Sequence, residues 1–128
     1  MENTKISEIT HFTHLNAWKK NHELVLEIYK ITKKFPKEEM FGITSQIRRA
    51  ASSITANIAE GYGRYHYKNK VKFYLISRGS SSEVQDFLIT AKDLGYVSRE
   101  DFDRIKIISF EGYKLICGLI RSTNSREK

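Results

Sequence analysis

The sequence predicts an all-α protein, an antiparallel up-and-down four-helix bundle. Apolar residues recur at three- and four-residue steps along four long segments, which is the pattern of amphipathic helices. No segment shows the sustained alternation of apolar and polar residues that a strand would show. The 128 residues, 40% of them hydrophobic, suit one domain with its own core. No repeat period is visible, which disfavours a solenoid.

The first helix is expected from about Asn16 to Lys34. Asn16 is a suitable N-cap, and Pro36 ends the helix because the residue before a proline avoids helical backbone angles. Residues 1–15 lack a sustained period and are expected to form an N-terminal arm. The apolar stripe of the helix consists of Trp18, Val25, Ile28, Tyr29, Thr32 and Phe35.

The second helix is expected from about Phe41 to Glu60. Gly61 is the natural residue to end it, and Gly63 lets the chain turn. The stripe of this helix includes two alanines, Ala50 and Ala51, whose small side chains would let a neighbouring helix approach closely.

The third helix, from about Lys68 to Leu94, carries one apolar stripe and a second, more polar one. Two contact faces imply packing on two sides, so this helix predicts self-association. The run from Gly79 to Ser82 is poor helix-forming sequence. We interpret it as a tight helix crossing, with a loop as the alternative, and Gly95 closes the helix. The more polar stripe consists of Val71, Leu75, Arg78, Ser82, Gln85 and Leu88.

The fourth helix is expected to begin at Ser98, which forms an approximate capping box with Asp101. Its apolar stripe fades near Arg121, and residues 122–128 are expected to form a frayed tail. The predicted organisation is therefore an arm over 1–15, a bundle over 16–121 and a C-terminal tail.

Motifs for catalysis or metal binding are scarce, so no catalytic residue, metal or cofactor is expected and the protein is not predicted to be an enzyme. His22-Glu23 resembles the start of a zinc HExxH motif, but Leu26 stands where the second histidine belongs. His11 and His14 alone are too few ligands for a metal. Cys117 is the only cysteine, which excludes an intrachain disulfide and favours a small buried hydrophobic role.

The start of the chain is polar and no apolar stretch approaches the ~20 residues that span a bilayer, so no membrane partner is expected and the cytoplasm is the expected compartment. The net charge of +7 favours anionic partners, although it is also explained by lysines that only keep the protein solvated.

The most informative segment is Gly61–Arg78, which holds five Lys and Arg residues, no acid, and interleaved aromatic residues. Cations neutralise phosphates and aromatic rings stack on unpaired bases, so this composition suits single-stranded RNA or DNA. The alternative is that the aromatic residues belong to the core and the lysines form a solvated face. The candidate nucleic-acid-binding residues are Arg64, Tyr65, Tyr67, Lys68, Lys70 and Lys72, extended by Arg48 and Arg49.

Arg78 lies on a stripe that faces the core, so it needs a charged partner. Glu60 and Glu83 are the candidates, and Asn57 is placed to join them. We interpret these four residues as a structural polar network that fixes helix register, rather than as a catalytic site.

Several blocks of the sequence together resemble a known bacterial family of four-helix-bundle proteins encoded by intervening sequences in 23S rRNA genes, some of which carry a ribosomal-protein-like name. The blocks are Trp18-Lys19-Lys20, Phe35-Pro36, Thr44–Ala51 (TSQIRRAA), Ser53–Gly61, Arg78-Gly79-Ser80 and Leu94-Gly95-Tyr96. The resemblance covers roughly residues 12–120. It implies an antiparallel four-helix bundle that assembles as a homopentamer, and it carries over no catalytic residue.

The resemblance extends to the accessory variability protein of diversity-generating retroelements, which is similar in fold, binds nucleic acid through a basic surface and partners a reverse transcriptase. One departure is Thr55, where the family usually has a proline that would kink the second helix. Two functions therefore stand as hypotheses. The first is a non-catalytic homo-oligomer, pentameric by resemblance, that binds RNA or DNA through basic surfaces. The second is a protein–protein interaction scaffold with no nucleic-acid role.

Overall fold

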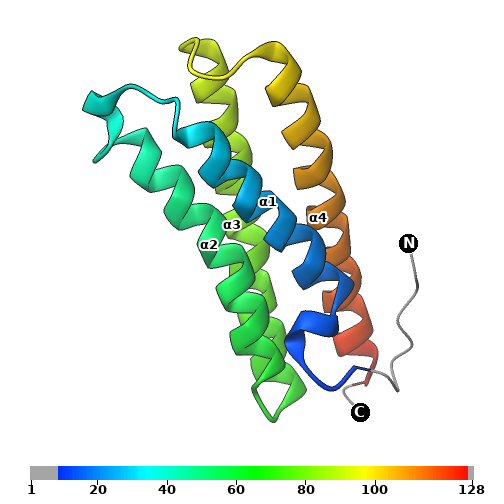
Figure 1. The fold of residues 1–128 in the computed structure, drawn as a ribbon. Helices are drawn as coiled ribbons and strands as arrows, with labels where there is room; N and C mark the ends of the chain where they lie inside the picture. Colours follow the sequence, from blue (N-terminus) through cyan, green and yellow to red (C-terminus); the bar gives the residue numbers. More distant parts are fainter. Residues whose placement is uncertain (1–8, 127–128) are drawn as a thin grey trace.

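The computed structural model describes residues 9–126 and contains four long helices that run alternately up and down (Figure 1). Two short 3₁₀ turns, η2 and η3, precede α1 and α2, and the described residues include no strand. The predicted all-α four-helix bundle is confirmed. The elements are η2 (Phe12–His14), α1 (Asn16–Thr32), η3 (Lys37–Glu39), α2 (Ile43–Tyr62), α3 (Tyr67–Asp93) and α4 (Arg99–Arg126).

The four helices form a square in which each packs against two neighbours, in the order α1, α2, α3, α4 and back to α1. The connections α1–α2 and α3–α4 lie at one end of the bundle, and the connection α2–α3 lies at the other (Figure 1). Among residues 9–126, no helix has the length and apolar character needed to cross a membrane.

The helices α2 and α3 make the most extensive contact, and small residues line it. Ser77 Oγ donates a hydrogen bond of 2.8 Å to the carbonyl oxygen of Ile54, and the hydroxyls of Ser53 and Ser80 lie 2.9 Å apart. Only side chains this short let the two backbones approach so closely. The tight crossing at the Gly79 to Ser82 run is therefore confirmed, and the loop alternative is wrong because α3 is continuous there.

The core lies along the inner faces of the helices, and on α1 it differs from the predicted stripe. Leu24, Ile28 and Ile31 are buried, whereas Trp18 is only half-buried and Tyr29 is exposed. The reason is that the helices packed against α1 are α2 and α4, so its buried face is a narrow strip between them, with η2 contacting it as well.

The predicted helix starts were partly wrong. Leu15, not Asn16, occupies the N-cap of α1, and it makes no side-chain hydrogen bond there. Ser98 caps α4 as expected, because the backbone N–H of Asp101 donates to Ser98 Oγ at 3.1 Å. Thr55 leaves α2 continuous and donates its hydroxyl hydrogen to the carbonyl oxygen of Ser52.

The predicted role of Gly61 was wrong. The helix α2 runs through Tyr62 and its C-cap is Gly63, so Gly61 is a helical residue. It is buried against α3, where an added Cβ would lie 2.7 Å from Tyr74 Cε1 and 3.0 Å from the carbonyl oxygen of Lys70. Glycine is needed at this position for close approach rather than for a turn.

The two chain ends also differ from the expectation. The predicted tail was wrong for residues 122–126, because α4 continues through Arg126 and buries Thr123. In the predicted arm, Phe12 packs edge-on against Trp18 with ring centroids 5.7 Å apart. The parts of the arm and tail at 1–8 and 127–128 lie outside the described residues. Cys117 is half-buried rather than buried.

The contrast between Gly61 and Gly79 gives a stability prediction. Gly61→Ala adds a methyl group against Tyr74 and is expected to destabilise the protein. Overpacking costs about 1–3 kcal/mol of folding free energy, which exceeds the ~1 kcal/mol gained by replacing glycine with alanine in a helix. Gly79→Ala adds a methyl group with no atom within 4 Å, so it is expected to stabilise the protein by up to ~1 kcal/mol. Urea unfolding at one protein concentration measures the free energy of unfolding of both variants. Equal effects of the two variants would contradict the close-approach role of Gly61.

Candidate nucleic-acid interface

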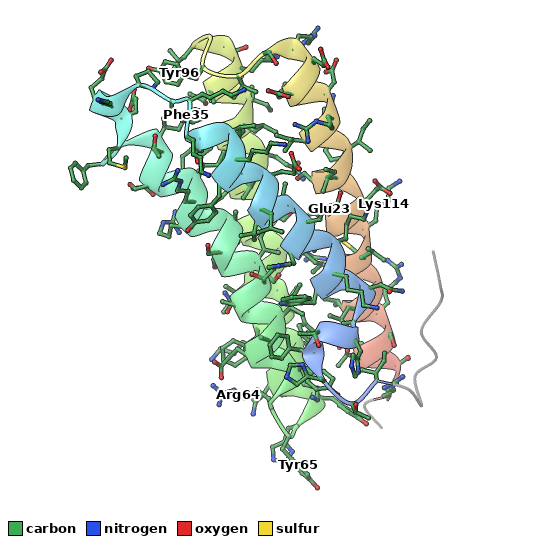
Figure 2. All side chains as sticks on the ribbon, viewed as in Figure 1. Glu23, Phe35, Arg64, Tyr65, Tyr96 and Lys114 are labelled. Carbon is green, nitrogen blue, oxygen red and sulfur yellow. The ribbon has the colours of Figure 1, made fainter. Side chains whose placement is uncertain are left out.

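The candidate interface is the end of the bundle where α2 turns into α3. Gly63 ends α2, and His66, in an extended conformation, precedes the first turn of α3. Tyr65 stands at the tip of this turn and points away from the bundle, and Arg64 lies next to it (Figure 2). Tyr65 is 89% exposed, and its ring meets that of His66 edge to face with the ring centroids 5.0 Å apart. Tyr67, the first residue of α3, is less exposed than Tyr65.

The two ends of the bundle differ strongly in charge. We define the basic end as residues 9–20, 58–74 and 115–126, which hold eight Lys and Arg residues and one acid, Glu60. Lys20, at its boundary, pairs with Glu23 at 3.2 Å. At the opposite end, residues 30–46 and 86–106 hold eight Lys and Arg residues and seven acids. The net charge of the protein is therefore concentrated at the basic end.

Some of the acids at the opposite end, Asp101 and Asp103 among them, pair with cations there. Arg104 contacts both Glu27 and Asp101, and its hydrogen bond to Asp101 holds the pKa of that carboxyl below its usual range. Arg99 and Asp103 lie 4.0 Å apart. Such exposed pairs stabilise the fold little, but they cancel charge locally.

The predicted cations at the basic end differ in how many contacts they already make within the protein. Lys68 and Lys72 are exposed and make no ion pair or hydrogen bond within residues 9–126. Arg64 donates to Glu60 at 2.8 Å and lies over the ring of Phe73 at 4.7 Å. The guanidinium retains further N–H donors for another acceptor.

Lys70 has a structural role. Its Nζ donates to the carbonyl oxygen of Tyr62, the last residue of α2, and lies 5.2 Å from the ring centroid of Tyr62. Burial lowers the pKa of Lys70. Its ammonium group therefore donates to a carbonyl oxygen at the C-terminal end of α2 and is poorly placed to bind phosphate.

Arg48 and Arg49, the predicted extension of the interface, lie apart from the basic end. Arg48 Nε donates to Thr32 Oγ1 at 2.8 Å, and Arg49 pairs with Glu83 at 3.0 Å. Both lie in the first half of α2, towards the opposite end of the bundle.

The predicted polar network was also wrong. Asn57 donates to the carbonyl oxygen and hydroxyl of Ser53, Glu60 pairs with Arg64, and Glu83 pairs with Arg49. Arg78 makes no ion pair with any residue that the structure describes. Its half-buried position leaves its guanidinium within reach of water, so a charged partner is not required.

A family model described as 23S rRNA-intervening sequence protein matches residues 13–118. The chain belongs to this family. A solved structure of a protein with unknown function, from the S23 ribosomal protein family of Bacteroides thetaiotaomicron VPI-5482, is similar with a TM-score of 0.75 and 25% identity. The similarity covers 81% of this chain and 97% of that one. No curated protein matches the chain.

Sequence reasoning missed part of the basic end of this 23S rRNA-intervening sequence protein. Arg121 and Arg126 belong to α4, and Lys19 and Lys20 belong to α1, so neither pair lies near residues 61–78 in the sequence. The spacing of Ile116, Ile120 and Thr123 continues the helical period and could have predicted the extension of α4.

The histidines do not assemble a metal site. The described part of the chain has no group of three or more His, Cys, Asp or Glu side chains that could hold a metal ion. His11 Nδ1 lies 2.8 Å from Thr13 Oγ1, and His22 stacks on Trp18 with ring centroids 4.5 Å apart.

Tyr74, which lies beneath the basic end and against Gly61, predicts an alkaline loss of stability. Burial raises the pKa of Tyr74 to about 12, against about 10 for an unfolded chain. The folded state keeps this proton at pH values where the unfolded state loses it, so stability falls as the pH rises above about 10. One such group contributes up to ~1.4 kcal/mol per pH unit. Urea unfolding across the alkaline range should show a shallower fall for Tyr74→Phe, with Tyr65→Phe as the control.

Proposed function

We propose that the protein is a non-catalytic, homo-oligomeric helical bundle that binds single-stranded RNA or DNA through its basic end. Five copies is the number that the family resemblance implies. The observation that carries the proposal is the charge difference between the two ends, with eight cations and one acid at one end and near balance at the other. A face of one sign attracts a polyanion far more than a mixed one does.

The accessible groups at the basic end suit both parts of a single strand. Lys68 and Lys72 are four residues apart on α3, so they lie on one face of the helix and can neutralise neighbouring phosphates. Arg64 adds guanidinium donors beside them. Tyr65 offers an exposed ring on which an unpaired base can stack.

Oligomerisation would strengthen such binding. Each copy contributes only a few phosphate contacts, and several copies on one strand add their contacts through multivalency. The family name refers to the location of the coding sequence in 23S rRNA genes, so it leaves the bound nucleic acid open.

The first test is the charge at the basic end. Lys68→Ala combined with Lys72→Ala should weaken binding to labelled oligo(U) or oligo(dT), and should lower the slope of log K against log salt by about 0.7 for each phosphate that is no longer neutralised. The matched control is Lys33→Ala with Lys34→Ala, which removes the same charge from exposed residues at the opposite end. Fluorescence anisotropy across a salt series measures both. Equal weakening in the two double variants would show that only net charge matters and would contradict a localised interface.

The second test is the exposed ring. Tyr65→Ala should weaken binding of single-stranded oligonucleotides about tenfold, since base–aromatic stacking contributes about 1–3 kcal/mol per base. Binding of a duplex should change little, because its bases are already stacked. Tyr65→Phe keeps the ring and should bind like the unmodified protein. An equal reduction in affinity for single strands and duplexes would overturn the stacking role.

A further inference from the structure

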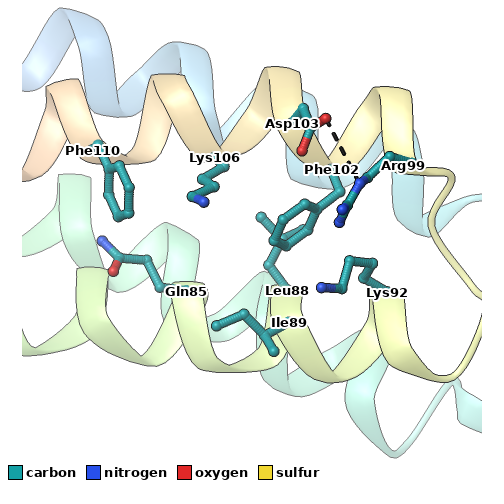
Figure 3. Close-up of a pocket in the computed structure, with 9 residues that line it drawn as sticks. All are labelled: Gln85, Leu88, Ile89, Lys92, Arg99, Phe102, Asp103, Lys106 and Phe110. Carbon is teal, nitrogen blue, oxygen red and sulfur yellow. Dashed lines mark ion pairs between the residues drawn. The ribbon is translucent and has the colours of Figure 1, made fainter.

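A groove between α3 and α4 lies at the end of the bundle opposite the basic end, and the proposed nucleic-acid binding does not use it (Figure 3). Its volume is about 350 Å³. Gln85, Leu88, Ile89 and Lys92 line it from α3, and Arg99, Phe102, Asp103, Lys106 and Phe110 line it from α4.

The groove has apolar walls and a positive rim. Phe102 is buried, whereas Ile89 and Phe110 are 48% and 44% exposed, so apolar surface faces water here. Lys106 Nζ lies 5.9 Å from the ring centroid of Phe102 and 5.6 Å from that of Phe110. Lys106 has no ion pair to any residue in 9–126, whereas Arg99 faces Asp103 (Figure 3). A partner that fits must carry both an apolar side chain and a carboxylate.

The same chain presents such a segment at Lys37–Phe41, between α1 and α2. Phe41 is 94% exposed, the highest value among the large hydrophobic residues that the structure describes, and Met40 beside it is 48% exposed. Glu38 is exposed and forms no ion pair with residues 9–126. The hydroxyl of Tyr96 donates to Glu39 Oε2 at 2.9 Å, which fixes the turn that displays Phe41.

The topology places this turn and the groove at one end of the bundle but on opposite sides of it. The turn joins α1 to α2, and the groove lies on the α3–α4 edge of the square of helices. A copy therefore cannot fill its own groove. A contact between two different surfaces of this kind is heterologous, and repeating it closes a ring when the rotation between copies permits.

We propose that the Lys37–Phe41 turn of one copy docks into the α3–α4 groove of the next copy. Phe41 enters between Ile89 and Phe110, and Glu38 faces Lys106. A phenylalanine buries about 150–250 Å², whereas a standard interface buries ~800 Å² per partner, so Phe41 acts as the anchor and the flanking helix faces complete the contact. The inference rests on the homo-oligomeric part of the proposed function and is independent of nucleic-acid binding.

The anchor is tested by Phe41→Ala, compared with Leu26→Ala as a matched control. Leu26 is a 57% exposed residue on α1 that belongs to neither surface. Both positions are exposed, so circular dichroism should show that both variants stay folded. Sedimentation velocity over a concentration series should give dissociation of the Phe41→Ala oligomer at concentrations at least about tenfold higher than for Leu26→Ala, the size of a moderate hot spot.

The pairing is tested by charge reversal. Glu38→Lys or Lys106→Glu alone should place like charges together and weaken the oligomer, and the two together should restore it. Additive weakening in the double variant would overturn the pairing of the two surfaces.

The two proposals fail in different ways. A wild-type protein that stays monomeric at micromolar concentration would overturn both the docking and the oligomeric part of the proposed function, whatever the binding of oligonucleotides. An oligomer that is unchanged by Phe41→Ala and by both single charge reversals would overturn only this docking. If the monomer instead captures an acidic, apolar peptide in the groove, the occupant is a different protein and the proposed self-docking is wrong.

Discussion

The close approach of α2 and α3 is the constraint on which the basic end depends. Serine hydroxyls at Ser53, Ser77 and Ser80 replace larger side chains at the crossing, and Gly61 lets Tyr74 pack directly against α2. A bulky residue at any of these positions would push the two helices apart. The turn between them would then move, and with it Arg64, Tyr65 and the first lysines of α3.

Side chains, rather than helix dipoles, create the charge difference between the ends of the bundle. In an up-and-down bundle, each end holds two helix N-termini and two C-termini, so the partial charges of the helix dipoles offset one another. What remains is the placement of the acids. Asp101, Asp103 and Glu39 occupy the opposite end and pair or hydrogen bond there, whereas Glu60 is the one acid at the basic end. Cations are equally numerous at both ends, so the absence of acids is what makes one end basic.

The recurrence of apolar residues predicted the four helices because each helix's pattern lies within its own segment of the sequence. The roles that failed to follow from the sequence depend on neighbours far along the chain. In the sequence alone Gly61 resembles a residue that ends a helix, and only the fold shows that it packs against Tyr74. In the same way, nothing near Arg49 in the sequence indicates its ion pair with Glu83, which the antiparallel packing of α2 and α3 creates. Arg126 joins the basic end only because α4 continues beyond the point where its apolar stripe fades. The sequence thus predicted the candidate interface at residues 61–78, but not which of its cations are free.

The distance between the α3–α4 groove and the basic end makes self-docking and nucleic-acid binding compatible. Ile89 and Lys68 are on the same helix, 21 residues or about 30 Å apart, which is about three Debye lengths at 0.1 M salt. Charge at the basic end therefore does little to oppose a contact made at the groove. Neighbouring basic ends in a ring would sit about two helix diameters apart, roughly 20 Å, so their mutual repulsion is also screened. A polyanion that lies across several basic ends neutralises the repulsion that is left between them. Binding of nucleic acid should therefore favour the assembled ring over the single copy.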